Sequence, residues 1–483
     1  MNTIILILLL LLTLLCVIHA NGYDIFCPGA LYCAVFILSG ATLFVLGQGL
    51  DIHINTVITI WLGAIAFSAG DVFAAILAKK DVKHRRDIAI SAVGDRIDIR
   101  VILLIMLIMI GGSIFTYIDI RRNANVGMSV SGTVIGAFKE QGANKSTVSS
   151  LINGLTSALA YAMLALVCYE YIEKNKIAWQ YIAIVLLYLP IVIVTGSRIQ
   201  VLYLVAIGIS ELSIIYARRY GWSYKTCIKI LKSVGMVLII TLAIFFLLGM
   251  LTGKSNSFRF TDIVLVYLGA PTYGLDQYLN VYFNVIEGNG VLAFRNISGL
   301  LKALGIPVGS ATFGYAIGRS AYGYYAILPL KGLYGNVYTG LFNWIHDVGT
   351  FGMIMVGFNI SLLFSMLRRR VISQPTKCIS ALTVLSIYYV PIFFMSIDDL
   401  FDDDLTYQRI LVAAFAYVFL RAYEKGYFSR RNSAIDVRSR SVRRPRIRKA
   451  PTYTINRRID SQGRYDAAAG ERVPVGFGDE KID

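Results

Sequence analysis

Long apolar runs separated by short polar stretches dominate the chain, and most are about as long as a membrane-crossing helix, roughly 20 residues. We expect about eleven spans (ten to twelve), near residues 3–20, 29–47, 56–78, 101–118, 149–169, 178–196, 198–217, 233–251, 347–367, 378–397 and 405–423. The first run lacks the basic segment and the clear cleavage site of a signal peptide, so we expect it to be retained. The pattern therefore predicts an all-α polytopic membrane protein.

The composition excludes most other classes of protein. Hydrophobic residues make up 56% of the chain and charged residues 16%, whereas an average soluble chain is roughly 25% charged. So much apolar surface excludes a soluble enzyme and a chain that is disordered over most of its length. Six Cys in 483 residues are too few for a secreted domain held together by disulfides.

Basic residues orient the predicted bundle, because they accumulate in cytoplasmic loops. They concentrate in four polar segments, at 79–100, 218–232, 368–377 and after residue 423. Eleven spans place all four segments on one side of the membrane. The N-terminus is then extracytoplasmic and the C-terminus cytoplasmic, and we expect the protein in a bacterial inner (plasma) membrane.

Four regions follow from this count. Residues 1–251 form the first eight spans and 347–424 the last three, while 252–346 form a large, partly helical extracytoplasmic segment that covers the bundle. The first part of that segment, 261–286, is apolar enough to lie in the interface or to dip into the membrane. The tail 425–483 holds 15 Lys and Arg against 7 Asp and Glu, and we expect it to be disordered and to contact anionic lipid rather than nucleic acid.

Motifs of soluble enzymes do not occur in the sequence. It has no P-loop, no zinc-protease motif, no CxxC and no nucleophile elbow. With only four His, a multi-His metal centre is unexpected. We therefore expect neither a metal nor a cofactor.

The first candidate site is a turn between two spans, Thr195-Gly-Ser-Arg198. Gly196 permits a tight turn. The backbone amides around Ser197 can form the N-terminus of a helix, which favours anions, and the planar guanidinium of Arg198 can bind a phosphate through two hydrogen bonds. Three further arginines of the outer segment could assist it: Arg259, Arg295 and Arg319. The alternative is that Arg198 only reaches out to water and that the other arginines are solvated. The functional interpretation is a diphosphate site at the outer face.

The second candidate site begins the ninth span. Asp347, at the start of that apolar helix, could be a general base toward a sugar hydroxyl, although Asp is also common in the first turn of a helix. His346 is the alternative base. Neighbouring side chains on a helix diverge by roughly 100°, so we do not expect both to face one substrate atom. The acidic run 398–404 lacks the spacing of a calcium loop, and we expect a solvated turn rather than a metal site.

The order of these pieces resembles the bacterial O-antigen or oligosaccharide repeat-unit polymerases (the Wzy type). The resemblance rests on the turn Thr195–Arg198, on Gly309-Ser-Ala-Thr-Phe-Gly314, and on Gly335-Asn-Val-Tyr-Thr339 followed by His346-Asp-Val-Gly349. These are similar to the TGSR, Gly-Thr-Phe and NVYT…DFG patterns of that family. Val348 departs from it, because an aromatic residue is commoner there.

The resemblance implies a GT-C-like membrane glycosyltransferase that polymerises undecaprenyl-diphosphate-linked oligosaccharides at the outer face. It implies transfer of the growing glycan en bloc to a new unit in surface polysaccharide biosynthesis, without a metal or a nucleotide sugar. Catalytic roles would fall to Arg198 and Asp347, with His346 as the alternative base. Substrate binding would fall to Ser197, Arg259, Arg295, Arg319, Asn336 and Tyr338. A flippase and a chain-length regulator are possible partners.

Three alternatives remain open from the sequence. A flippase or transporter of lipid-linked saccharides would be expected to carry charges in mid-span and symmetry between its halves, whereas here the charges gather at one face. An O-antigen ligase shares the chemistry and is poorly separated from a polymerase. A non-catalytic scaffold gives no reason for outward Arg and Asp residues.

Overall fold

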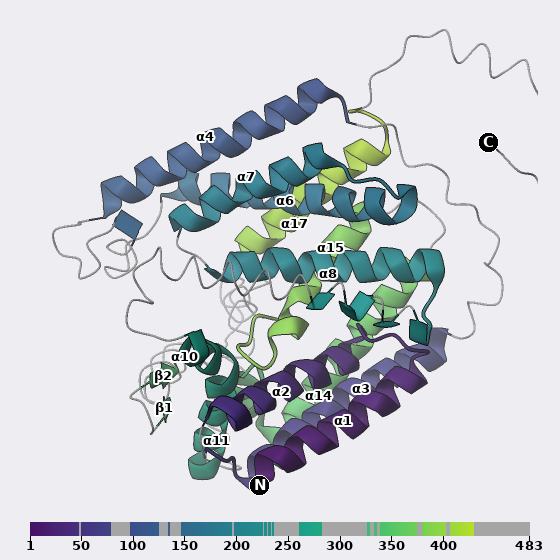
Figure 1. Cartoon of the computed structure of the whole chain (residues 1–483), viewed down its shortest axis with the longest axis vertical. Coiled ribbons are helices and arrows are strands. Elements are labelled where there is room, and N and C mark those ends of the chain that lie inside the picture. Colours follow the sequence, from purple (N-terminus) through teal and green to yellow (C-terminus); the bar gives the residue numbers. More distant parts are fainter. Residues whose placement is uncertain are drawn as a thin grey trace, which may run out of the picture. The chain divides into compact units, whose positions relative to one another are not determined.

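The structure is a computed structural model of the whole chain (Figure 1). It describes residues 1–47, 50–78, 97–124, 134–135, 146–195, 198–225, 227–228, 230–232, 234–235, 260–282, 326–328, 333–335, 339–373, 379–401 and 406–428. The chain divides into the units Met1–Arg430 and Arg431–Asp483. The second unit, which is most of the basic tail, lies outside the described residues.

Four helices form the first group: α1 (Asn2–Ala20), α2 (Pro28–Leu46), α3 (Ile54–Ala78) and α14 (Leu341–Ser373). Figure 1 shows them side by side. The closest approach is between α3 and α14, because a Cβ on Gly70 would lie 2.6 Å from the carbonyl oxygen of Phe358. The Ser361 hydroxyl of α14 donates to the carbonyl oxygen of Phe67 at 2.5 Å. Small residues therefore bring these two backbones together although they are far apart in the sequence.

Six helices surround a second hydrophobic core: α4 (Ile99–Asn123), α6 (Thr147–Lys174), α7 (Trp179–Thr195), α8 (Arg198–Tyr220), α15 (Ile379–Phe394) and α17 (Tyr407–Glu424). Polar side chains cap three of them at their N-termini. Asp98 accepts from the Arg100 amide at 3.0 Å, Ser146 from Ser149 at 3.2 Å, and Thr406 from Arg409 at 3.4 Å.

The surface of several helices is apolar and bare. Only 22% of the most apolar window of α1 and 28% of that of α4 is buried inside the protein. Leu12 on α1 and Leu107 on α4 are among the large side chains left exposed. Continuous apolar surface of this kind suits lipid and not water, which supports a membrane-embedded protein.

The segment between the groups contributes three short helical pieces and a hairpin: α10 (Phe260–Val264), the π-helix η3 (Leu265–Gly269), α11 (Ala270–Tyr282), and the antiparallel strands β1 (Ala326–Leu328) and β2 (Leu333–Gly335). The Ser39 hydroxyl of α2 donates to the Leu268 carbonyl at 2.5 Å and lies 2.6 Å from the Thr272 hydroxyl. Ser39 stands seven residues before the end of α2, so this apolar segment packs along a membrane-type helix.

The described residues confirm an all-helical architecture apart from the three-residue strands. Ten of the predicted spans coincide with helices, and the remaining one, 233–251, lies almost wholly outside the described residues. Among the described residues, seven helices are long and apolar enough to cross a membrane: α1, α2, α3, α4, α6, α8 and α14. Because α7 and α15 are shorter and α17 carries more charge, the total of eleven spans stays a prediction.

Candidate functional site

The start of α14 carries the sequence-predicted pair His346 and Asp347. The His346 Nδ1 lies 3.1 Å from the Asp347 Oδ1, and the two side chains are 7% and 0% exposed. We expected neighbouring side chains to diverge around the helix axis, and here they meet. His346 also packs against the Phe342 ring, with centroids 5.9 Å apart. The pair is thus a buried dyad rather than an open base at a helix start.

The helix breaks directly after this dyad. Gly349 has φ 68° and ψ 179°, a backbone conformation essentially restricted to glycine. The break divides α14 into a short first part that ends beside Asp347 and a long second part that continues to Ser373. Sequence patterning had placed the start of this span at residue 347, and it missed both the earlier helical residues and the break. Discontinuous helices build the substrate sites of many membrane transporters.

A second His–Asp pair joins α11 to the start of α3. Asp276 on α11 is buried, with a side chain that is 2% exposed. Its Oδ1 accepts from the His53 backbone amide and from the Thr56 hydroxyl, both at 2.6 Å. Its Oδ2 lies 2.9 Å from the His53 Nδ1. The imidazole of His53, by contrast, is 56% exposed.

The same helix α11 reaches the first dyad. The Tyr278 ring lies edge-on to Phe342 with centroids 4.8 Å apart, and 6.3 Å from the His346 ring. The start of α3, helix α11 and the start of α14 therefore meet at one end of the first helix group. Figure 1 shows α11 at this end together with α10 and the hairpin. We call this region the α11 end; by the orientation predicted from the basic loops it is the outer face.

The turn after α15 also belongs to this end. The Gly340 amide donates to the Met395 carbonyl at 2.8 Å, and the Asn343 side chain donates to the Asp399 carboxylate at 3.2 Å. Asp399 is 7% exposed. The prediction of a solvated acidic turn is therefore wrong for Asp399, because an amide of α14 binds it. Residues 402–405 lie outside the described residues. Within the part of the chain that the structure describes, no group of three potential metal ligands occurs.

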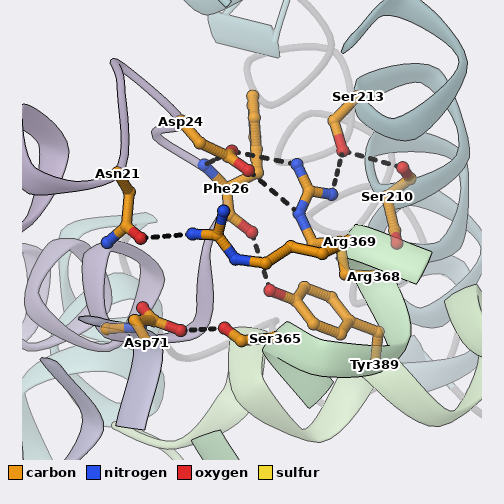
Figure 2. A network of polar contacts seen from close by, with 11 residues as sticks. Asn21, Asp24, Phe26, Asp71, Ser210, Ser213, Ser365, Arg368, Arg369 and Tyr389 are labelled. Carbon is orange, nitrogen blue, oxygen red and sulfur yellow. Dashed lines mark hydrogen bonds and ion pairs between the residues drawn. The ribbon is translucent and has the colours of Figure 1, made fainter. Parts of the chain in front are cut away.

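A second polar cluster lies further along α3 and α14 (Figure 2). The Arg368 guanidinium donates to the Asp24 carboxylate at 2.9 and 3.2 Å and to the Ser213 hydroxyl at 3.3 Å. Asp71 accepts from the Gly29 amide at 2.6 Å and from the Ser365 hydroxyl. We call this region the Arg368 cluster; by the predicted orientation it is on the cytoplasmic side.

A further buried acid, Glu211, lies within α8. Glu211 is fully buried, and the Thr383 hydroxyl of α15 lies beside it. Within the described residues, neither Glu211 carboxyl oxygen meets the geometry of a hydrogen bond. The expectation that charges gather at one face is therefore wrong, because Asp71 of α3 and Glu211 of α8 are buried within membrane-type helices.

Most other sequence-predicted residues fall outside what the structure describes. The helix α7 ends at Thr195 and α8 begins at Arg198, and the two residues between them lie outside the described residues. The side chain of Arg198 and the predicted site residues Ser197, Arg259, Arg295, Arg319, Asn336 and Tyr338 lie outside the described residues. The structure thus brings together only His346 and Asp347 of the predicted set.

Sequence reasoning missed His53 and Asp276. They are 223 residues apart, and no local motif links them. One signal was present: the helix starting at Ile54 has no Ser, Thr, Asn or Asp directly before it, so its first amides needed an acceptor from elsewhere. Asp276 lies at this helix start, where it accepts from the backbone amide of His53, the residue before the helix, and from the Thr56 hydroxyl.

Comparison of the chain with protein-family models, with curated proteins and with solved structures finds no match. The family resemblance therefore rests on the motifs alone.

Proposed function

We propose that the protein is a glycosyltransferase of a bacterial inner membrane that polymerises oligosaccharide units linked to undecaprenyl diphosphate. In this reaction a hydroxyl of the new unit attacks the anomeric carbon of the growing chain. The new C–O bond forms as the bond to the diphosphate breaks, and the diphosphate leaves with the electron pair. A base of the protein takes the hydroxyl proton.

One observation carries the proposal. The α11 end gathers two His–Asp pairs, from three segments far apart in the sequence, at the end of the bundle where the predicted topology puts the lipid-linked donor. Buried acids that orient an imidazole are typical of sites that move a proton. One of the three sequence motifs that resemble the polymerases, Gly335–Thr339 followed by His346–Gly349, has residues at this same end, Gly335 of β2 and His346 of α14.

Arg198 has the proposed role of stabilising the leaving diphosphate. Replacing it by Ala should abolish polymer while the amount of protein stays normal. Arg198→Lys should be nearly as damaging, because a point charge lacks the planar fork. The measurement is a gel of surface polysaccharide from a deletion strain that carries each variant. A normal ladder from Arg198→Ala would remove Arg198 from the site.

A second candidate is a flippase of the same lipid-linked units, and Glu211 favours it. A buried acid without a hydrogen-bond partner among the described residues, inside a membrane-type helix, is common in transporters. In the deletion strain a lost flippase would remove all surface glycan and leave lipid-linked units inside. A lost polymerase would leave single units at the surface.

A further inference from the structure

We infer that His53 is the general base of the α11 end and that Asp276 is its positioning residue. The inference rests on the proposed function, because the proton it accepts is that of a sugar hydroxyl. In this inference His53, and not Asp347 as the sequence predicted, is the base.

The two oxygens of Asp276 have separate tasks. Oδ1 accepts from the His53 amide and the Thr56 hydroxyl, and both bonds anchor the start of α3. Oδ2 faces the Nδ1 of the imidazole at 2.9 Å. An anchor for the helix needs only the first oxygen. The second contact fixes the ring and its tautomer, because an ionised carboxylate can only accept a hydrogen bond and so keeps the ring proton on Nδ1.

The fixed ring presents its other nitrogen as an acceptor. With Nδ1 donating, Nε2 carries the lone pair, and the described residues offer it no hydrogen-bond partner. The imidazole is 56% exposed while the carboxylate behind it is 2% exposed. A buried acid behind an accessible imidazole is the arrangement by which a His takes a proton from a hydroxyl.

Asp347 is the weaker candidate on the same criteria. Its side chain is 0% exposed, and a hydroxyl of a bulky saccharide cannot approach it without moving the helices that cover it. Tyr278 and Phe342 cover the His346 ring beside it. This dyad is better suited to holding the break at Gly349 in place than to taking a proton from substrate.

The test uses four full-length variants in the deletion strain, with membrane levels matched by immunoblot. His53→Gln keeps a polar side chain and the backbone bond to Asp276 but has no basic nitrogen. Asp276→Asn keeps an acceptor oxygen but cannot stabilise the imidazolium. Thr56→Val removes one anchor bond and leaves the Oδ2 contact intact. Asp347→Asn tests the rival base.

The rate is then measured on membranes supplied with lipid-linked repeat unit extracted from the deletion strain. We expect kcat to fall about 10²–10⁴-fold in His53→Gln, with KM nearly unchanged. Asp276→Asn should lower kcat in the same way, while Thr56→Val keeps the wild-type kcat. Asp347→Asn should retain more activity than His53→Gln.

Two results would overturn the inference and leave the proposed function standing. One is normal polymer from His53→Gln. The other is a loss in Thr56→Val as large as that in Asp276→Asn, which would reduce the contact to an anchor for α3. If wild-type protein does not lengthen the unit at all, the proposed function fails, and the role of His53 with it.

Discussion

Both ends of the α3–α14 pair contain buried charge, and the two ends differ in one respect. In the Arg368 cluster, the side chains of Arg368 and Asp24 are 2% and 11% exposed and form an ion pair with each other. Arg368 also donates to the Ser213 hydroxyl. At the α11 end, Asp276 is equally buried, but the imidazole that it holds is 56% exposed. A closed ion pair fixes helices, whereas a buried acid behind an open imidazole can act on something outside. Under the proposed function, the difference separates a structural cluster from a reactive one.

The largest expected effect is at the closed cluster. Arg368→Ala leaves Asp24 buried without its partner, and breaking such a pair costs about 3–5 kcal/mol. We expect the folded protein to be nearly lost from membranes, as measured by immunoblot and by size-exclusion profile in detergent. The exposed neighbour Arg370 is the control, and Arg370→Ala should accumulate normally. Equal amounts of both variants would show that the cluster does not hold the helices.

The close packing of α3 against α14 at Gly70 should be nearly as sensitive to substitution. In Gly70→Ala the new Cβ would lie 2.6 Å from the Phe358 carbonyl oxygen and 2.8 Å from the Leu362 amide nitrogen. Such overpacking costs about 1–3 kcal/mol, and we expect a lower Tm in detergent. Gly111→Ala on α4 is the matched control, since a Cβ there meets nothing within 4 Å. A Tm for Gly70→Ala no lower than that of Gly111→Ala would contradict the close approach of α3 and α14.

The break in α14 should affect activity more than folding. At Gly349 the φ of 68° with ψ of 179° costs any other residue about 1–3 kcal/mol, so Gly349→Ala should straighten the helix locally. That change moves Asp347 and the covering Phe342 relative to α11. We expect near-normal protein amount and a strongly shortened glycan ladder. An unchanged ladder would mean that the break has no part in the site.

The smallest effect concerns the orientation on which the comparison depends. Burial raises the pKa of the Cys27 thiol well above its usual value, and Asp71 and Asp24 raise it further. Since the thiolate is the reactive form, Cys27 should resist maleimide at neutral pH. The less buried Cys227 should react faster.

Variants with a single cysteine allow the same labelling to show on which side of the membrane each cysteine lies. An impermeant maleimide should label Cys227 only after cells are opened, because the sequence predicts its segment to be cytoplasmic. Labelling of Cys227 on intact cells would invert the two ends and contradict the assignment of the α11 end to the outer face.

The sequence predicted the helices well because each long apolar run has to be a helix in lipid. It also located His346 and Asp347 at the start of a span. It did not predict their mutual contact or the break at Gly349, since a single glycine in an apolar run has no periodic signature. Nor did it predict the His53–Asp276 pair or the Arg368–Asp24 pair, whose partners are 223 and 344 residues apart. Such pairs depend on tertiary packing, which local patterns do not encode.

The most direct test of the central claim uses the purified full-length protein in liposomes with lipid-linked repeat unit extracted from the deletion strain. The account predicts that the glycan lengthens by whole units, with release of one polyprenyl diphosphate for each bond formed. Transfer of the units across the bilayer, without any lengthening, would contradict it.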